Sequence, residues 1–292
     1  MMFLGYNTNG LAHHAWTDAV ELLARIGYRG IGWTLDHDWV RREGTDFHLR
    51  EDVEKMASLC RHWGLTTVVE TGARFLLDPC RKHQPNLLDP DPPQRQFRQR
   101  YYQLAVQVAH HLKSDAVSIW SGMAPAEEIG GNGTIWDERL VRELICLLDY
   151  AQSYSVRVAL EPEPGMWIAE MADFGRLLSL LEQISPSHAE RLFLTVDIGH
   201  LYCQGEPIRE NLRKYASRIV NIHLDDARRG VHEHLFLGEG EVDFAEVLDV
   251  LREIGYSGGV YVELSRHSAT APTTAREALV FWNTLMNERF LN

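Results

Sequence analysis

The stretch that decides the fold is Phe244–Glu263, which reads FAEVLDVLREIGYSGGVYVE. Its first half carries apolar residues at helical spacing and predicts a helix over 244–254. Gly255 then stands where a helix commonly ends in a left-handed residue, and 260–263 is short and β-rich. The stretch therefore predicts a helix, a cap and a buried strand, which together form the repeating unit of a parallel α/β fold.

The same unit recurs along the chain, and Gly27 and Gly64 occupy the place of Gly255 after two earlier helices. The predicted strands are 3–6, 30–34, 66–70, 116–120, 157–161, 193–197, 219–223 and 260–263. The clearest predicted helices are 15–26, 51–63, 101–111, 137–153, 174–184 and 244–254. Eight such units close most simply into a barrel, so we predict an α/β fold with a single (β/α)8 TIM-barrel domain over 1–292.

A doubly wound open sheet is the competing fold. The first strand leads into Gly5–Gly10, GYNTNG, which has neither a G-x-G-x-x-G fingerprint nor a P-loop, so the closed barrel is favoured. The largest irregularity is 76–96, which is rich in Pro and Asp and is predicted to be an irregular loop insertion after the third strand. We interpret it as a partial lid over substrate, with a solvated oligomer contact as the alternative.

Composition and charge exclude several classes of function. Apolar residues make up 45% and charged residues 24%, which is typical of a globular protein. The net charge of −12 opposes binding to nucleic acid or to an anionic membrane, and no apolar run approaches the length of a bilayer span. The N-terminus lacks the features of a signal peptide, so a cytoplasmic location is predicted. The four scattered cysteines form no C-x-x-C pair, which argues against disulfides and thiolate zinc sites.

The later predicted strands each end on a residue that can bind a metal or transfer a proton, and in a TIM barrel these ends form the active-site face. In chain order these residues are Glu161, Asp197, His223 and Glu263. Each alone has a simpler interpretation, because a carboxylate at a strand end often caps a helix and a lone histidine is often a hydrogen-bond partner. Their recurrence on four consecutive units favours a shared site over coincidence.

Unpaired carboxylates that converge in a barrel mouth would cost several kcal/mol each, and a divalent cation removes that cost. Carboxylates with one imidazole suit a hard to borderline ion, so we expect one divalent metal, with Mn²⁺ favoured over Mg²⁺, Co²⁺ or Zn²⁺. Such an ion makes a proton next to a carbonyl easier to remove, and a carboxylate then takes that proton.

The chain resembles the xylose isomerase-like TIM barrel family, which includes sugar isomerases and epimerases and endonuclease IV. The resemblance covers essentially the whole chain and rests on the motifs DIGH (197–200), NIHLDD (221–226) and GEGEVDF (238–244). It implies that Glu161, Asp197, His223 and Glu263 hold the metal, that the two glutamates also exchange protons with substrate, and that His200 binds a substrate hydroxyl. A homo-oligomer is likewise implied by the resemblance.

Further polar residues at the predicted mouth are candidates for substrate binding, each with a structural alternative. Those that bear on substrate are Glu70, Trp120, Arg229, His232, His234 and Arg266. Glu70 is either a partner of sugar hydroxyls or an ion-pair partner of Arg74, and Trp120 is either a packing residue or a stacking surface. His232 and His234 would share one face if that segment is extended, where they either contact substrate or bind a second metal, or else lie in a solvated loop.

The favoured function is a metal-dependent isomerase or epimerase that acts on a sugar or polyol-derived ketone through an enediolate. The alternatives are a metal-dependent hydrolase or lyase that uses an activated water, and a barrel that binds sugar without catalysis. Endonuclease IV relatives use additional histidines in the first half of the barrel, where this chain has Glu70 and Trp120. That difference and the negative charge disfavour DNA as a substrate.

Overall fold

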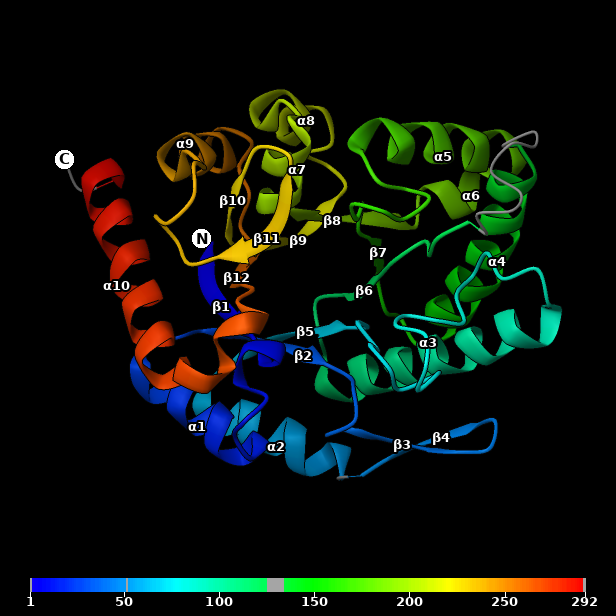
Figure 1. Cartoon of the computed structure of the whole chain (residues 1–292), viewed down its shortest axis with the longest axis horizontal. Coiled ribbons are helices and arrows are strands. Elements are labelled where there is room, and N and C mark those ends of the chain that lie inside the picture. The colour runs from blue at the N-terminus through cyan, green and yellow to red at the C-terminus, as the bar shows by residue number, and fades with distance from the viewer. Residues whose placement is uncertain (1, 51, 125–133, 291–292) are drawn as a thin grey trace. The chain divides into compact units, whose positions relative to one another are not determined.

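The computed structural model describes residues 2–50, 52–124 and 134–290, and its central feature is a closed parallel barrel. Around the barrel, the strand order is β1-β12-β9-β8-β7-β6-β5-β2. The strands are β1 (Phe3–Asn7), β2 (Gly30–Thr34), β5 (Thr66–Glu70), β6 (Val117–Ile119), β7 (Val158–Leu160), β8 (Leu192–Asp197), β9 (Ile219–Leu224) and β12 (Gly259–Val262). Figure 1 labels these strands and the helices that connect them along the chain. The barrel confirms the predicted fold class, and strands 30–34 and 66–70 have the predicted bounds.

The chain divides into two compact units, and the first consists of residues 1–33, 58–68 and 195–292. Within it, β1 pairs in parallel with β2 and β12, and β12 pairs with β9. Its helices are η1 (Thr8–Leu11), α1 (Trp16–Ile26), α7 (Ile198–Gln204), α8 (Ile208–Lys214), α9 (Phe244–Glu253), η3 (Ser265–Thr270) and α10 (Ala271–Phe290). Strand residues such as Ile31, Ile222 and Val260 are fully buried and form its core.

The second unit consists of residues 34–57 and 69–194. Its parallel pairings join β5 to β6, β6 to β7, and β7 to the first half of β8. Its helices are α3 (Pro92–Leu112), α4 (Thr134–Ser153), α5 (Met171–Ile184) and α6 (Pro186–Ala189), and α2 (Val53–Trp63) runs from this unit into the first. Glu51, the first residue of the helix predicted over 51–63, lies outside the described residues.

The structure corrects the extent of the proline-rich loop. Helix α3 begins at Pro92, so residues 92–96 are helical rather than irregular. The reason is positional, because a proline in the first turn of a helix gives up an N–H that would have no intrahelical partner. Residues 71–91 contain neither helix nor strand, as expected for the rest of the predicted loop.

Two antiparallel hairpins were not predicted as strands. In the second unit, β3 (Val40–Glu43) pairs with β4 (Asp46–Leu49). In the first, β10 (Asp226–Arg228) pairs with β11 (Val231–Leu235), and this hairpin, yellow in Figure 1, packs against α7. No helix within the described residues is both long and apolar enough to cross a membrane.

Candidate active site

The end of β8 provides the first element of the site. Asp197 is the last residue of β8, and its Oδ1 accepts a hydrogen bond of 2.8 Å from the backbone N–H of His200, which caps α7. This capping bond explains the three-residue spacing between Asp197 and His200. Asp197 is only 2% exposed, and its second oxygen, Oδ2, has no hydrogen-bond donor among the described residues. Asp197 therefore both caps a helix and presents an unsatisfied carboxylate oxygen.

His223 on β9 and Glu263 after β12 bring two more ligand atoms to that oxygen. The Nδ1 atom of His223 lies 3.9 Å from Asp197 Oδ2 and 2.9 Å from Glu263 Oε2. One ligand atom from each of the three residues lies within 4.8 Å of the others. The structure thus brings together three of the four predicted metal ligands within the first unit.

Two asparagines orient Glu263, and the sequence reasoning missed both. Asn7 Nδ2 donates to Glu263 Oε2 over 3.2 Å, and Asn9 Nδ2 donates to Oε1 over 2.8 Å. Both are buried, at the end of β1 and in η1. The signal was present in GYNTNG, where polar amides follow a buried strand of the barrel.

The surroundings keep the carboxylates ionised. Burial alone would raise the pKa of Asp197, but His200, His234 and His223 together lower it below the usual value. Burial likewise opposes ionisation of Glu263, yet His223 and His234 hold the pKa of that carboxyl well below its usual range. Both side chains therefore carry negative charge at neutral pH.

This donor set fits a divalent cation. Two ionised carboxylates and one imidazole are the ligand types that Mn²⁺, Zn²⁺ and related ions accept, and none of the described residues donates a hydrogen bond to Asp197 Oδ2. A metal-binding imidazole commonly donates its second N–H to a neighbour. The atom of Asn221 that lies 3.1 Å from His223 Nε2 is its amide nitrogen, Nδ2; with the oxygen and nitrogen of this amide exchanged, the oxygen would accept that N–H.

Three histidines form a cluster beside this group. His200 Nε2 lies 3.1 Å from His232 Nε2, and the rings of His232 and His234 have centroids 5.6 Å apart. His232 and His234 both lie on β11, so the expectation that they share one face of an extended segment is confirmed. Burial lowers the pKa of His200 to about 4, so this ring is neutral at neutral pH.

His234 has a buried acidic partner that was not among the predicted site residues. Its Nδ1 contacts Asp225 Oδ2, and Asp225 is 1% exposed. Burial would lower the pKa of His234, but the Asp225 carboxylate raises it to about 10. Burial and the nearby Asp197 also raise the pKa of Asp225 well above its usual value, and we regard this pair as a protonated histidine held by a carboxylate.

In the second unit, Glu161 follows β7 and is 3% exposed. Trp120 Nε1 donates a hydrogen bond of 2.9 Å to Glu161 Oε2, so Trp120 orients this carboxylate. Glu70 ends β5 and is buried. Arg74, the alternative partner considered for Glu70, lies 3.9 Å from Asp36.

The two predicted arginines are both exposed. Arg229 is exposed, its guanidinium lies 4.5 Å from the centroid of the Tyr202 ring, and its backbone N–H donates to Glu241. Arg266 is exposed on η3. Their roles in substrate binding stay predictions.

Comparisons with known proteins identify the family. A model of the xylose isomerase-like TIM barrel family matches residues 20–285. The chain belongs to this family. The solved structures that it resembles include an L-ribulose 3-epimerase, with a TM-score of 0.75 at 16% identity over 99% of this chain and 96% of that chain. Another is the IolI protein with a bound zinc atom, with a TM-score of 0.74 at 18% identity over 99% of both chains. At these identities, the likeness shows the fold alone.

Curated relatives of this xylose isomerase-like chain are similar over shorter stretches. An uncharacterized protein of Methanocaldococcus jannaschii is 32% identical over 168 residues, which are 54% of each chain. Inosose dehydratase of Clostridium perfringens is 29% identical over 134 residues, 39% of this chain and 45% of the relative. Fructoselysine 3-epimerase of Shigella flexneri is 28% identical over 186 residues, 63% of this chain and 65% of the relative. The chain thus spans about half the length of the first two.

Proposed function

We propose that this protein is a divalent-metal-dependent isomerase or epimerase of a sugar or polyol-derived ketone. The observation that carries the proposal is the cluster of Asp197, His223 and Glu263, in which a buried carboxylate oxygen has no hydrogen-bond donor among the described residues. The curated relatives include a sugar epimerase and a dehydratase of a cyclic polyol ketone, which supports an enzyme that acts on polyhydroxylated ketones.

Glu161 is the proposed fourth ligand. Its strand, β7, neighbours β8 in the barrel order, and parallel strands of a closed barrel end at one mouth. Trp120 donates a hydrogen bond to one oxygen of Glu161, which gives this carboxylate a defined orientation. Mn²⁺ is our first choice of ion, since three carboxylates and one imidazole suit it, with Zn²⁺, Mg²⁺ and Co²⁺ as alternatives.

When bound, the ion would act as a Lewis acid that makes a proton next to the substrate carbonyl easier to remove. Glu161 and Glu263 are the proposed acid/base pair: one carboxylate oxygen takes the proton from carbon and the other glutamate returns one. Asn7 and Asn9 orient Glu263, and Trp120 orients Glu161, so each carboxylate has a defined direction of approach. Two glutamates on opposite sides of a substrate carbon would invert that carbon, which is epimerisation.

Polar and aromatic side chains from several elements are the proposed contacts for substrate. His200 is neutral at neutral pH and can both donate to and accept from a hydroxyl. The remaining proposed substrate-binding residues are Glu70, Trp120, Arg229, His232, His234 and Arg266. A cytoplasmic location and a homo-oligomeric state stay predictions.

A lyase is the second candidate, because inosose dehydratase is among the relatives. Both reactions can begin when a carboxylate removes a proton next to a carbonyl, and they differ in the next step. An epimerase returns a proton to carbon, whereas a dehydratase expels a hydroxyl group. In the lyase, we propose that His234, whose raised pKa keeps it protonated, or its neighbour His200 assists the departure of that group.

Metal content tests the proposed site. We would measure bound metal by elemental analysis in the wild type and in His223→Ala and Glu263→Ala, each purified without chelator and again after Mn²⁺ reconstitution. His111→Ala is the matched control, because His111 is half exposed and its ion pair is with Glu54. Near-stoichiometric metal that is lost in the two site variants and kept in the control supports the site. Absence of metal from reconstituted wild type contradicts it.

Isotope exchange separates the two reactions. A panel of ketoses and inososes is incubated with the Mn²⁺-loaded protein in D₂O and analysed by NMR and mass spectrometry. An epimer or isomer labelled with deuterium at carbon supports the proposed function. A product that has lost the mass of one water supports the lyase. If the protein binds metal but forms neither product from any substrate, a barrel that binds sugar without catalysis is favoured.

A further inference from the structure

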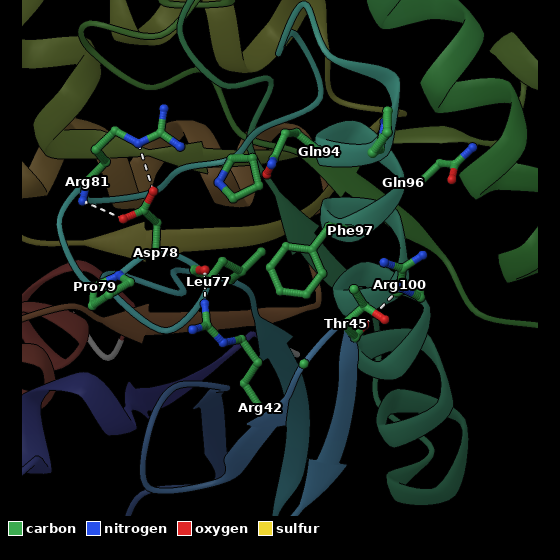
Figure 2. A pocket seen from close by; sticks show the side chains of 13 residues that line it. Arg42, Thr45, Leu77, Asp78, Pro79, Arg81, Gln94, Gln96, Phe97 and Arg100 are labelled. Atoms are coloured by element: carbon green, nitrogen blue, oxygen red, sulfur yellow. Dashed lines mark hydrogen bonds and ion pairs between the residues drawn. The ribbon is translucent and has the colours of Figure 1, made fainter.

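A separate cavity lies wholly within the second unit, where the β3–β4 hairpin, the loop after β5 and the start of α3 come together. Its volume is about 450 Å³, within the range of sites for small molecules. Figure 2 shows the ring of Phe97 between side chains from these three segments. Phe97 stacks on Phe47 at 4.9 Å between ring centroids, so one side of the cavity is a packed aromatic surface.

The charged groups that line the cavity are three arginines and one aspartate. Asp78 is already engaged: it accepts hydrogen bonds from the backbone N–H groups of Cys80 and Arg81 and from Arg81 Nε. Arg81 and Asp78 therefore neutralise each other. The positive charges of Arg42 and Arg100 are not compensated by this pair.

Backbone carbonyls, rather than carboxylates, hold Arg42 and Arg100. Arg42 Nη1 donates to Leu77 O, and Arg100 Nε donates to Thr45 O over 2.9 Å. Neither guanidinium forms an ion pair with a carboxylate of the described chain. Each of these hydrogen bonds fixes a side chain without removing its charge, and most of its N–H donors stay available.

This local excess of positive charge contrasts with the net charge of −12 of the whole chain. Arg41, on the same strand as Arg42, is by comparison paired with Glu43. Two uncompensated guanidinium groups on different segments, at one cavity, match the charge of a dianion better than that of a single carboxylate. Gln94 and Gln96 add neutral amides to the lining.

We propose that this cavity binds the phosphate group of a small phosphorylated molecule through Arg42 and Arg100. The cavity is larger than a phosphate group needs, so it leaves room for an organic portion beside Phe97. The inference is independent of the proposed metal site, because the cavity is lined by none of the residues proposed for the metal or for substrate there.

Isothermal titration calorimetry of the full chain tests this inference. The probes are fructose 6-phosphate, fructose, inorganic phosphate and succinate, a dianion without phosphorus. The variants are Arg42→Gln, Arg100→Gln and the double variant, and the thermal unfolding of each is compared with that of the wild type. Arg42→Lys or Arg100→Lys, which keep the positive charge, replaces a glutamine variant that unfolds at a lower temperature than the wild type. Arg41→Gln is the matched control, since Arg41 is adjacent, half exposed and paired with Glu43.

We expect fructose 6-phosphate to bind the wild type and the Arg41→Gln variant alike, with about tenfold weaker binding in each single variant at the site. Equal affinity for inorganic phosphate would identify free phosphate as the ligand, and tighter binding of the ester would identify a phosphorylated metabolite. Binding of succinate but not of phosphate would overturn the proposal. The proposal would also be overturned if the double variant bound fructose 6-phosphate as tightly as the wild type, or if the wild type bound no phosphate compound. Loss of binding only in Arg229→Gln or Arg266→Gln would overturn it as well.

Discussion

Asp226 binds the segment that follows the β10–β11 hairpin, and its removal should destabilise the first unit strongly. The side chain is 1% exposed. Its Oδ2 accepts from the N–H groups of Gly238 and Gly240 at 2.8 and 2.9 Å, and its Oδ1 accepts from Val242 and Ala227 at 3.0 and 2.9 Å. A Cβ on Gly240 would lie 2.3 Å from Asp226 Oδ1, so this close approach requires glycine.

The expected magnitude follows from the groups that would be left without a partner. The Asp226→Ala variant deprives three distant backbone N–H groups of their acceptor, and each loss costs about 1 kcal/mol even where water can partly replace it. The total is about 3 kcal/mol, before any contribution from the cavity left by the carboxylate. Asp226→Asn should lose nearly as much, because its amide NH₂ would face two of the N–H donors.

Equilibrium urea unfolding, followed by circular dichroism and tryptophan fluorescence, measures this change. Asp249→Ala is the control: Asp249 is about 43% exposed and pairs with Arg289 at 3.1 Å. An exposed pair of this kind is worth less than about 1 kcal/mol. If Asp226→Ala lost no more stability than the control, the four hydrogen bonds would not anchor the segment, and the reasoning would be refuted.

Three further predictions concern the surroundings of Asp225 and of Glu161. Gly199→Ala places a Cβ 2.1 Å from Asp225 Oδ1, so we expect a loss of about 1–3 kcal/mol in urea unfolding. The raised pKa of His234 means that its protonated form stabilises the fold, and this contribution is lost as the pH rises toward about 10. In chelator-treated protein, the urea midpoint of unfolding should therefore fall between pH 7 and pH 10. The fall should be smaller in Asp225→Asn, which lacks the carboxylate that raises this pKa. Trp120→Phe removes the donor to Glu161 and should weaken Mn²⁺ binding by about tenfold in a calorimetric titration, whereas equal affinity would show that this hydrogen bond does not support the ion.

The barrel was predictable because its strands are short, apolar and separated by helices with regular caps. The strands over 30–34 and 66–70 are bounded by glycine and by polar residues, and their bounds were predicted correctly. The β3–β4 hairpin escaped prediction, because 40–49 reads VRREGTDFHL, contains four charged residues and is mostly exposed. Its stability comes from packing of β4 against α3, which the local pattern does not contain.

The candidate site was predictable where position alone carries information. The closeness of Asp197, His223 and Glu263 was predictable because each lies at, or next to, the last residue of a barrel strand. Asn7, Asn9 and Asp225 were missed, since they act on other side chains rather than stand in a recognised ligand pattern. Residues that orient a ligand become visible only when the distances are known.

The charges of the first unit favour a cation as the missing component of its cluster. Asp197 and Glu263 have lowered pKa values and stay ionised, while burial keeps His200 neutral. Protonated His234 is paired with Asp225, which leaves its charge largely compensated. Two ionised carboxylates therefore lie beside His223, and Asp197 Oδ2 has no hydrogen-bond donor among the described residues, so a counter-ion would stabilise the pair. A divalent cation would balance both, whereas an anionic substrate group would add to the repulsion. The cavity of the second unit has an excess of positive charge instead, because Arg42 and Arg100 are held there by backbone carbonyls. The chain therefore carries one environment suited to a metal and another suited to a phosphate.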